Sequence, residues 1–99
     1  MNIRIQSVNF EATEALQAYV DKKMSKLERF HDGILTADVF LKVIKPETAM
    51  NKQAEIKASV KGEEFFASKI GNTFEDAVDL AAEAIDKQVK KRKEKLIKQ

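Results

Sequence analysis

The sequence predicts an α+β domain in which a four-stranded, mostly antiparallel sheet carries two helices packed on one face. In some segments apolar residues alternate with a period of two, which predicts strands; in others they recur at three- and four-residue steps, which predicts helices. These segments follow one another in the order β-α-β-β-β-α. The 99 residues suffice for one hydrophobic core, so both helices must cover the same sheet. We therefore expect a single domain over residues 1–99.

The chain opens with a predicted strand at residues 2–8, where isoleucines alternate with polar residues. A helix is expected to follow from Thr13, whose hydroxyl can accept a hydrogen bond from the first turn, to about Phe30. Gly33 lies where this helix should stop, because glycine readily adopts the left-handed conformation that ends helices. The apolar positions at helical spacing predict its buried side: Leu16, Val20, Met24 and Leu27.

The middle of the chain predicts three strands at about residues 35–44, 53–60 and 63–70. Pro46 interrupts the alternation after the first of them, because proline cannot continue a hydrogen-bonded ladder. Lys61-Gly62 forms the next turn, although lysine is not the favoured first residue of a type I′ turn. Short turns favour an antiparallel meander, and the first strand should pair beside it after the helical crossover.

The last quarter of the chain, residues 73–98, predicts one long helix with an acidic first half and a basic second half. Thr73 and Asp76 have the spacing of a capping box, with Asp in place of the usual Glu. The charge changes sign at Asp86–Lys87, where we expect the helix to leave the cover of the sheet. The apolar stripe of this helix consists of Phe74, Val78, Ala81, Ile85, Val89 and Leu96.

Both predicted helices carry lysines along one flank, and such flanks can meet a nucleic-acid backbone. The lysines of the last helix recur about every four residues and advance about 6 Å per lysine, close to the spacing of successive phosphates. The alternative is that the helix dipole favours cations in C-terminal turns and that surface lysines are common. The last helix alone does not decide between the two. The flanks are Lys22, Lys23 and Lys26 on the first helix, and Lys87, Lys91, Lys95 and Lys98 on the last.

We expect one of these flanks to line the groove between the helices and to make it a basic cleft. The acidic flank of the last helix is expected to turn away from a bound nucleic acid. Lys90 and Lys93 lie over the continuation of this acidic face and are expected to be solvated or auxiliary. The acidic flank consists of Glu75, Asp79, Glu83 and Asp86.

The composition contains few of the residue types and motifs that enzymatic catalysis uses. The absence of cysteine excludes a thiol nucleophile, a disulfide framework and a Cys-based metal site, and three scattered glycines exclude a phosphate-binding loop. The single histidine, His31, should cap a helix or lie on the surface, and Asp79 and Glu83 have the spacing of ordinary solvated charges. We expect no enzymatic activity, no cofactor and no metal. Without a signal peptide or long apolar run, a cytoplasmic location with no membrane partner is expected.

Base stacking on the open face of the sheet is poorly supported. Phe65 and Phe66 should point to opposite faces of their strand, and only Phe40 or Phe65 is available as a stacking aromatic. The element order differs from that of an RRM, and the aromatic motifs of that fold are missing. The other open-face positions are polar or charged: Asp38, Lys42, Glu55 and Lys57.

Short motifs spread over the whole chain occur in a distinctive combination. They are TEAL at 13–16, YV at 19–20, KMSKLERF at 23–30, KG at 61–62, Asp79, KQVKK at 87–91 and KL at 95–96. This combination resembles the ribosome hibernation promoting factor and ribosome-associated inhibitor A family. In the short form of this family no C-terminal dimerisation domain follows, and the chain ends at Gln99.

The resemblance implies a bacterial stationary-phase or stress factor that binds the small ribosomal subunit in the channel between head and body. There it would lie over rRNA where mRNA and the A- and P-site tRNAs sit, and so inhibit translation without turnover. Off the ribosome it would be a monomer. Family positions and neighbouring cations give the expected rRNA-binding set: Lys22, Lys23, Lys26, Arg29, Lys87, Lys90, Lys91, Arg92 and Lys95.

Two departures from the family pattern occur at Ala84, where a lysine is common, and at Glu75, near which an aromatic is common. The contact at position 84 should be lost, and Lys90, Arg92 and Lys93 are candidates to replace it. A general RNA-binding module or RNA chaperone is the alternative function. A protein adaptor whose contact surface is Asp76, Asp79 and Glu83 is a third hypothesis. Pairing of ribosomes and silencing of single ribosomes are both compatible with the sequence.

Overall fold

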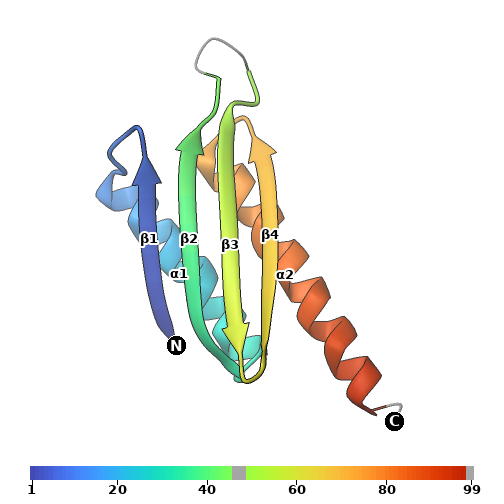
Figure 1. Cartoon of the computed structure of the whole chain (residues 1–99). Helices are drawn as coiled ribbons and strands as arrows, with labels where there is room; N and C mark the ends of the chain where they lie inside the picture. The colour runs from blue at the N-terminus through green and yellow to red at the C-terminus, as the bar shows by residue number, and fades with distance from the viewer. Residues whose placement is uncertain (46–48, 98–99) are drawn as a thin grey trace.

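The computed structural model describes residues 1–45 and 49–97, with side chains described up to residue 94 of the last helix. The predicted β-α-β-β-β-α order is confirmed (Figure 1). Pro46 and Lys98 lie outside the described residues. The elements are β1 (Asn2–Val8), α1 (Glu14–Phe30), β2 (Ile34–Val43), β3 (Lys52–Val60), β4 (Glu63–Gly71) and α2 (Phe74–Ile97).

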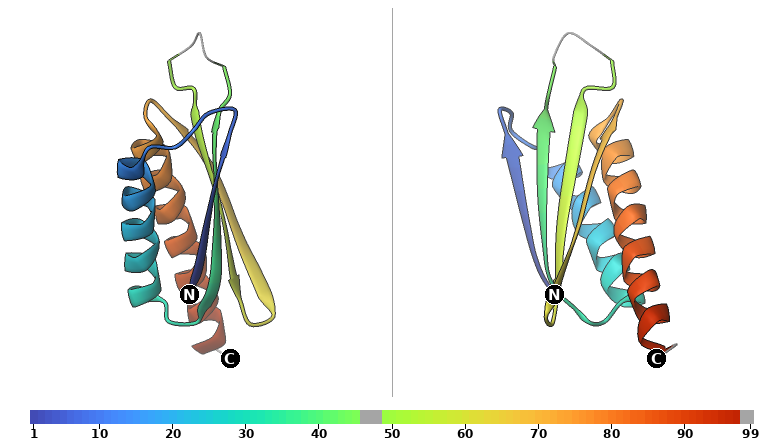
Figure 2. Two further views of the ribbon diagram at one scale, coloured as in Figure 1. Left: turned by 90° about the vertical axis from the view of Figure 1, so that its left-hand side faces the viewer. Right: turned by 45° about the vertical axis from the view of Figure 1, so that its right-hand side comes forward.

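The four strands form one sheet in the order β1-β2-β3-β4. β2, β3 and β4 are antiparallel to their neighbours in the meander, whereas β1 pairs parallel to β2, as a helical crossover requires. Both helices lie on the same side of the sheet, and the other face is left open (Figure 2). The predicted fold class is therefore confirmed. Neither described helix is long and apolar enough to cross a membrane.

The core lies between the sheet and the two helices and follows the predicted alternation. Alternate residues are buried in the middle of β2 (Ala37, Val39, Leu41) and of β3 (Ala54, Ile56, Ala58), and the predicted stripes of α1 and α2 join the same core, except that Leu96 lies outside the described side chains. Packing apolar side chains from both layers is the main source of stability in a domain of this size. The fully buried large side chains are Val20, Met24, Val39, Leu41, Ile56, Val78 and Ile85.

Both helices begin as their capping residues predict. The Leu16 N–H donates to Thr13 Oγ1 at 3.1 Å, and the Asp76 N–H donates to Thr73 Oγ1 at 3.0 Å. The ring of Phe10 stacks on that of Phe74 with a centroid distance of 4.5 Å. The starts of the two helices are thereby held to one another at the same end of the sheet.

Two expectations about the faces of the fold are wrong. α2 does not leave the cover of the sheet at Asp86–Lys87, because Val89 is only 4% exposed. Together with Ile34 and Val60, Val89 lines a hollow between α2 and the sheet. The ends of β2 and β3 extend the apolar cover by one helical turn. Phe65 is buried in the core, so the exposed aromatic of β4 is Phe66.

Candidate nucleic-acid interface

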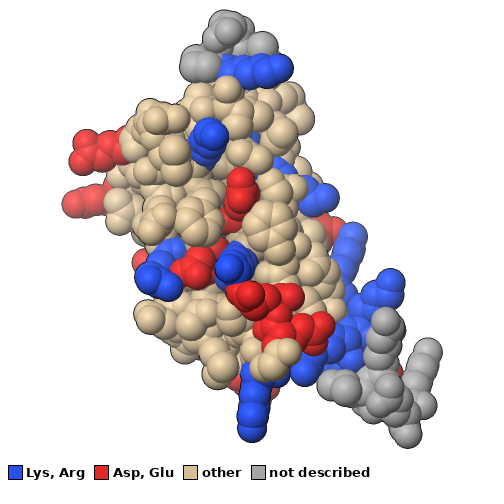
Figure 3. Space-filling model, viewed as in Figure 1, with Lys and Arg blue, Asp and Glu red and all other residues tan. Residues whose placement is uncertain are grey.

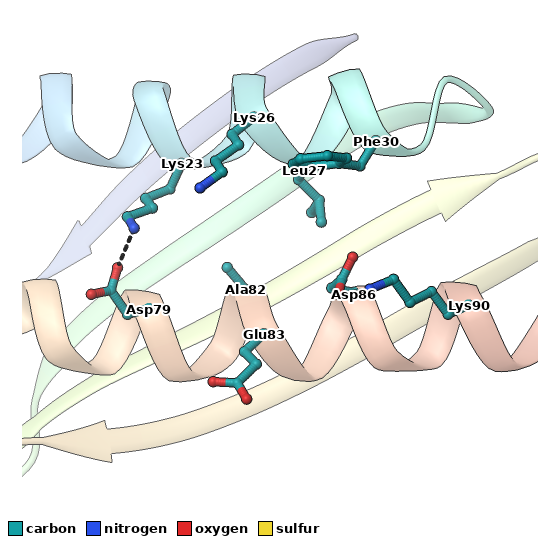
Figure 4. A pocket seen from close by; sticks show the side chains of 9 residues that line it. All are labelled: Lys23, Lys26, Leu27, Phe30, Asp79, Ala82, Glu83, Asp86 and Lys90. Carbon is teal, nitrogen blue, oxygen red and sulfur yellow. Dashed lines mark ion pairs between the residues drawn. The ribbon is translucent and has the colours of Figure 1, made fainter.

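A groove of about 260 Å³ runs between α1 and α2 on the helical layer (Figure 4). The lysine flank of α1 lines it, as expected for one of the two flanks. The groove is not simply basic, however, because acidic residues of α2 line it as well. Its lining residues are Lys23, Lys26, Leu27 and Phe30 from α1, and Asp79, Ala82, Glu83, Asp86 and Lys90 from α2.

One end of the groove is closed by contacts of Asp79 with α1. The Tyr19 hydroxyl donates to Asp79 Oδ1 at 2.7 Å, and Lys23 Nζ lies 3.1 Å from the same oxygen. The Lys23 ammonium also lies 5.5 Å from the centroid of the Tyr19 ring. The hydrogen bond with Asp79 raises the pKa of Lys23, so this lysine stays charged. The acidic flank of α2 therefore faces α1 at this position instead of turning away from its lysines.

The buried side chain of His31, which is 3% exposed, does not line the groove but contacts Asp86 from behind it, beside a separate hollow. Its backbone N–H donates to the Leu27 carbonyl at 3.0 Å, which confirms the expected role at the end of α1. The expectation of a surface residue is wrong: Nε2 lies 2.6 Å from Asp86 Oδ1 and Nδ1 lies 3.2 Å from Lys93 Nζ. An ammonium has only donors, so Nδ1 accepts from Lys93, and the ring donates its Nε2 proton to Asp86.

Asp86 joins the two helices and also holds a lysine at the groove. Its second oxygen lies 3.0 Å from Lys90 Nζ. Burial raises the pKa of Asp86, but the hydrogen bonds from His31 and Lys90 outweigh it and leave this pKa below the ordinary value. Because the folded-state pKa of Asp86 is lowered, its hydrogen-bonded carboxylate stabilises the fold above the unfolded-state pKa, and this stabilisation is lost as the pH falls through the folded-state value.

The expected rRNA-binding residues divide between the groove and the outer side of α2. Lys90 is at the groove, whereas Lys87 lies outside it, 74% exposed and 3.3 Å from Glu83. Lys91 and Arg92 line a separate hollow beside β4, where Arg92 contacts Glu63. The side chain of Lys95 lies outside the described residues. The groove set is Lys23, Lys26 and Lys90, the exposed α1 surface adds Lys22 and Arg29, and the outer set is Lys87, Lys91 and Arg92.

The open face of the sheet carries charges of both signs, whereas Lys and Arg gather over the C-terminal half of α2, at the lower right of the space-filling view (Figure 3). On the open face Arg4 pairs with Asp38 at 3.0 Å and Lys57 with Glu64 at 3.2 Å. These pairs neutralise the face locally. Among the residues that the structure describes, the open face therefore shows no patch of one sign comparable to the C-terminal half of α2 (Figure 3).

Residues 3–97 match the model of the family described as Sigma 54 modulation protein / S30EA ribosomal protein. The chain belongs to this family. It is 34% identical to the ribosome hibernation promoting factor of Azotobacter vinelandii, over 98% of this chain and 87% of that protein. It is also 34% identical to the factor of the same name from Escherichia coli K12, over 97% of each chain. The solved N-terminal domain of Thermus thermophilus Protein Y is 33% identical with a TM-score of 0.77, over 92% of this chain and 98% of that one.

The two positions at which we expect the sequence to depart from the family pattern lie in different surroundings. Ala84 packs against the edge of the core, which a methyl group suits, and Glu75 is exposed beside Phe10 and Phe74. Within the described residues no cluster of His, Asp or Glu is arranged to hold a metal ion. The contacts of Tyr19 and His31 with α2 were missed by sequence patterns, because their partners lie 60 and 55 residues away.

The Tyr19–Asp79 contact predicts that the pKa of Tyr19 is raised, and absorbance spectroscopy can measure this directly. The chain has one tyrosine and no tryptophan, so tyrosinate absorbance reports Tyr19 alone. The hydrogen bond to Asp79, followed by burial, raises the pKa of Tyr19 above the ordinary 10.0. The contact therefore stabilises the fold below the unfolded-state pKa, and this stabilisation is lost as the pH rises through the folded-state value.

In a pH titration the native chain should show a higher tyrosinate midpoint than the chain in denaturant. Asp79→Ala should remove most of the difference, whereas Asp76→Ala, an exposed carboxylate on the same helix, should leave it unchanged. Equal midpoints in the native and denatured chains would contradict the contact.

Proposed function

We propose that this chain is a ribosome hibernation factor. It binds the rRNA of the small ribosomal subunit through cations of α1 and α2, occupies the channel used by mRNA and by the A- and P-site tRNAs, and inhibits translation during stationary phase or stress. The support is membership of the S30EA family together with the names of the relatives, which are ribosome hibernation promoting factors. The factor acts in the cytoplasm as a monomer and by occlusion, without catalytic turnover.

The observation that carries the proposal is a set of available cations on the helical layer. Four of them are exposed and form no ion pair with any residue in the described part of the chain, so their charge is not cancelled locally. A cation that neutralises an RNA phosphate releases condensed counterions, which favours binding. These four residues are Lys22, Lys26, Arg29 and Lys91.

Pairing does not remove the remaining lysines from such a surface. The Lys87–Glu83 and Lys90–Asp86 pairs join residues four apart on one helix; the lysine side chains are 74% and 64% exposed, whereas Asp86 is only 28% exposed. An exposed pair such as Lys87–Glu83 contributes at most about 1 kcal/mol and is screened by salt. Lys87 can therefore exchange its carboxylate partner for a phosphate, and Lys90 can contact a phosphate with the ammonium donors that Asp86 does not use.

Sedimentation of ribosomal particles in sucrose gradients tests the proposal. The chain should travel with small subunits, and tRNA together with mRNA bound to the subunits should displace it. An excess of free duplex RNA should displace it poorly. Equal competition by duplex RNA would instead favour a general RNA-binding module, and absence from the subunit fractions would reject the proposal. The same gradient reports whether ribosomes pair when the chain is added.

A further inference from the structure

Phe30 is the most exposed aromatic side chain in the described part of the chain, and it lies at the edge of the groove between the helices. It is the last residue of α1, is 64% exposed and lines the groove beside Leu27 (Figure 4). An exposed ring next to lysines is the usual platform on which unpaired bases stack, because every base has a flat π-face.

Across the groove from Phe30, the Asp86 carboxylate projects from α2 toward α1 (Figure 4). Its oxygens are fixed by His31 and by Lys90, which each use one of them. A carboxylate offers about four lone-pair sites, so acceptor capacity remains on this pre-oriented group. Cytosine, adenine and guanine carry amino donors on their pairing edges, and uracil carries an N3–H donor there, so an unpaired base can donate to this carboxylate.

Two exposed cations line the same groove. Lys26 lines the groove from α1 and is exposed, and Lys90 lines it from α2 with its side chain 64% exposed. The groove therefore combines a stacking ring, a fixed acceptor and two exposed cations. These are the three kinds of group that one unpaired nucleotide requires.

We propose that the groove between α1 and α2 binds a single unpaired nucleotide of the RNA. The base stacks on Phe30 and donates its amino group to Asp86, while Lys26 and Lys90 contact the adjoining phosphates. This inference rests on the proposed RNA-binding function and deepens it, because it adds base recognition to a surface otherwise defined by phosphate contacts.

Phe30→Ala tests the stacking contact on small ribosomal subunits. Loss of one stacked base should weaken binding roughly five- to hundredfold. The slope of log affinity against log salt should stay unchanged, because no phosphate contact is removed. Phe30→Tyr keeps the ring and should bind within about twofold of the unchanged chain. Circular dichroism checks that each variant is folded.

Phe66→Ala is the matched control. Phe66 is also an exposed aromatic, at 53%, but lies on the open face of the sheet, so its removal should not change affinity. Equal binding by Phe30→Ala and the unchanged chain would overturn the inference and leave the proposed function standing. Failure of the unchanged chain to bind subunits would instead reject the proposed function.

Homopolymeric RNA tests the role of Asp86 separately. Cytidine and N4,N4-dimethylcytidine oligomers of equal length carry the same phosphates and the same ring, but only cytidine keeps its amino hydrogens, so a difference in affinity reports the amino donor. Cytidine oligomers should bind more tightly, and Phe30→Ala should reduce this preference. Equal affinity for the two oligomers would overturn the assignment of Asp86 as the acceptor.

Discussion

Lys87→Glu combined with Lys91→Glu should abolish co-sedimentation with small ribosomal subunits while leaving the fold intact. Both side chains are exposed on the outer side of α2. Each reversal removes a phosphate contact and adds repulsion from the remaining phosphates, so we expect affinity to fall by about a hundredfold or more at moderate salt. Surface substitutions of this kind change stability by only about 0.5 kcal/mol each.

The control for this variant is Lys42→Glu combined with Lys57→Glu. It changes the net charge by the same amount, but both lysines are exposed on the open face of the sheet. This variant should still sediment with the subunits, apart from a modest loss caused by the altered net charge. If the α2 variant binds as well as the unchanged chain, the outer side of α2 is not part of the interface.

Ile85→Ala should be the most destabilising of the single substitutions considered, because the side chain is fully buried between α2 and the sheet. Truncating a buried isoleucine removes transfer free energy and leaves a cavity, and the cost is about 2 to 5 kcal/mol. Urea denaturation followed by circular dichroism measures the free energy of unfolding. In a marginally stable domain this loss is a large share of the total.

Leu80→Ala is the matched control on the same helix. Its side chain is 45% exposed, so the same truncation to alanine should lower the free energy of unfolding far less, by about 0.5 kcal/mol. A similar cost for both variants would mean that α2 does not pack as described. The comparison also matters for function, since the cations of α2 keep their positions only while its apolar stripe is docked.

The sequence predicts the fold well because local and periodic signals agree in this chain. Thr13 and Thr73 mark helix starts that the structure confirms through hydrogen bonds to the first turn. Alternation in β2 and β3 identifies the buried face of the sheet, since the helices must cover the apolar side. Each of these signals depends on residues within one turn or one strand, which is the range over which sequence patterns are informative.

The parts that the sequence does not predict depend on how distant elements meet. His31 is buried because α2 runs beside the end of α1 (Figure 4) and brings Asp86 to its ring, a contact between residues 55 apart. Phe65 and Phe66 are adjacent apolar residues, and only the pairing of β4 with β3 decides which of them enters the core. The balance of acidic and basic side chains that line the groove likewise depends on the rotation of α2 about its own axis.

The salt dependence of binding to small ribosomal subunits tests the central claim most directly. If the cations of α1 and α2 neutralise rRNA phosphates, log affinity should fall linearly with log salt, by about 0.7 to 0.9 per phosphate contact. The Lys87→Glu, Lys91→Glu variant should show a shallower slope where binding remains measurable. Affinity that does not weaken between low and moderate salt would contradict a phosphate-based interface and favour an adaptor that binds a protein partner.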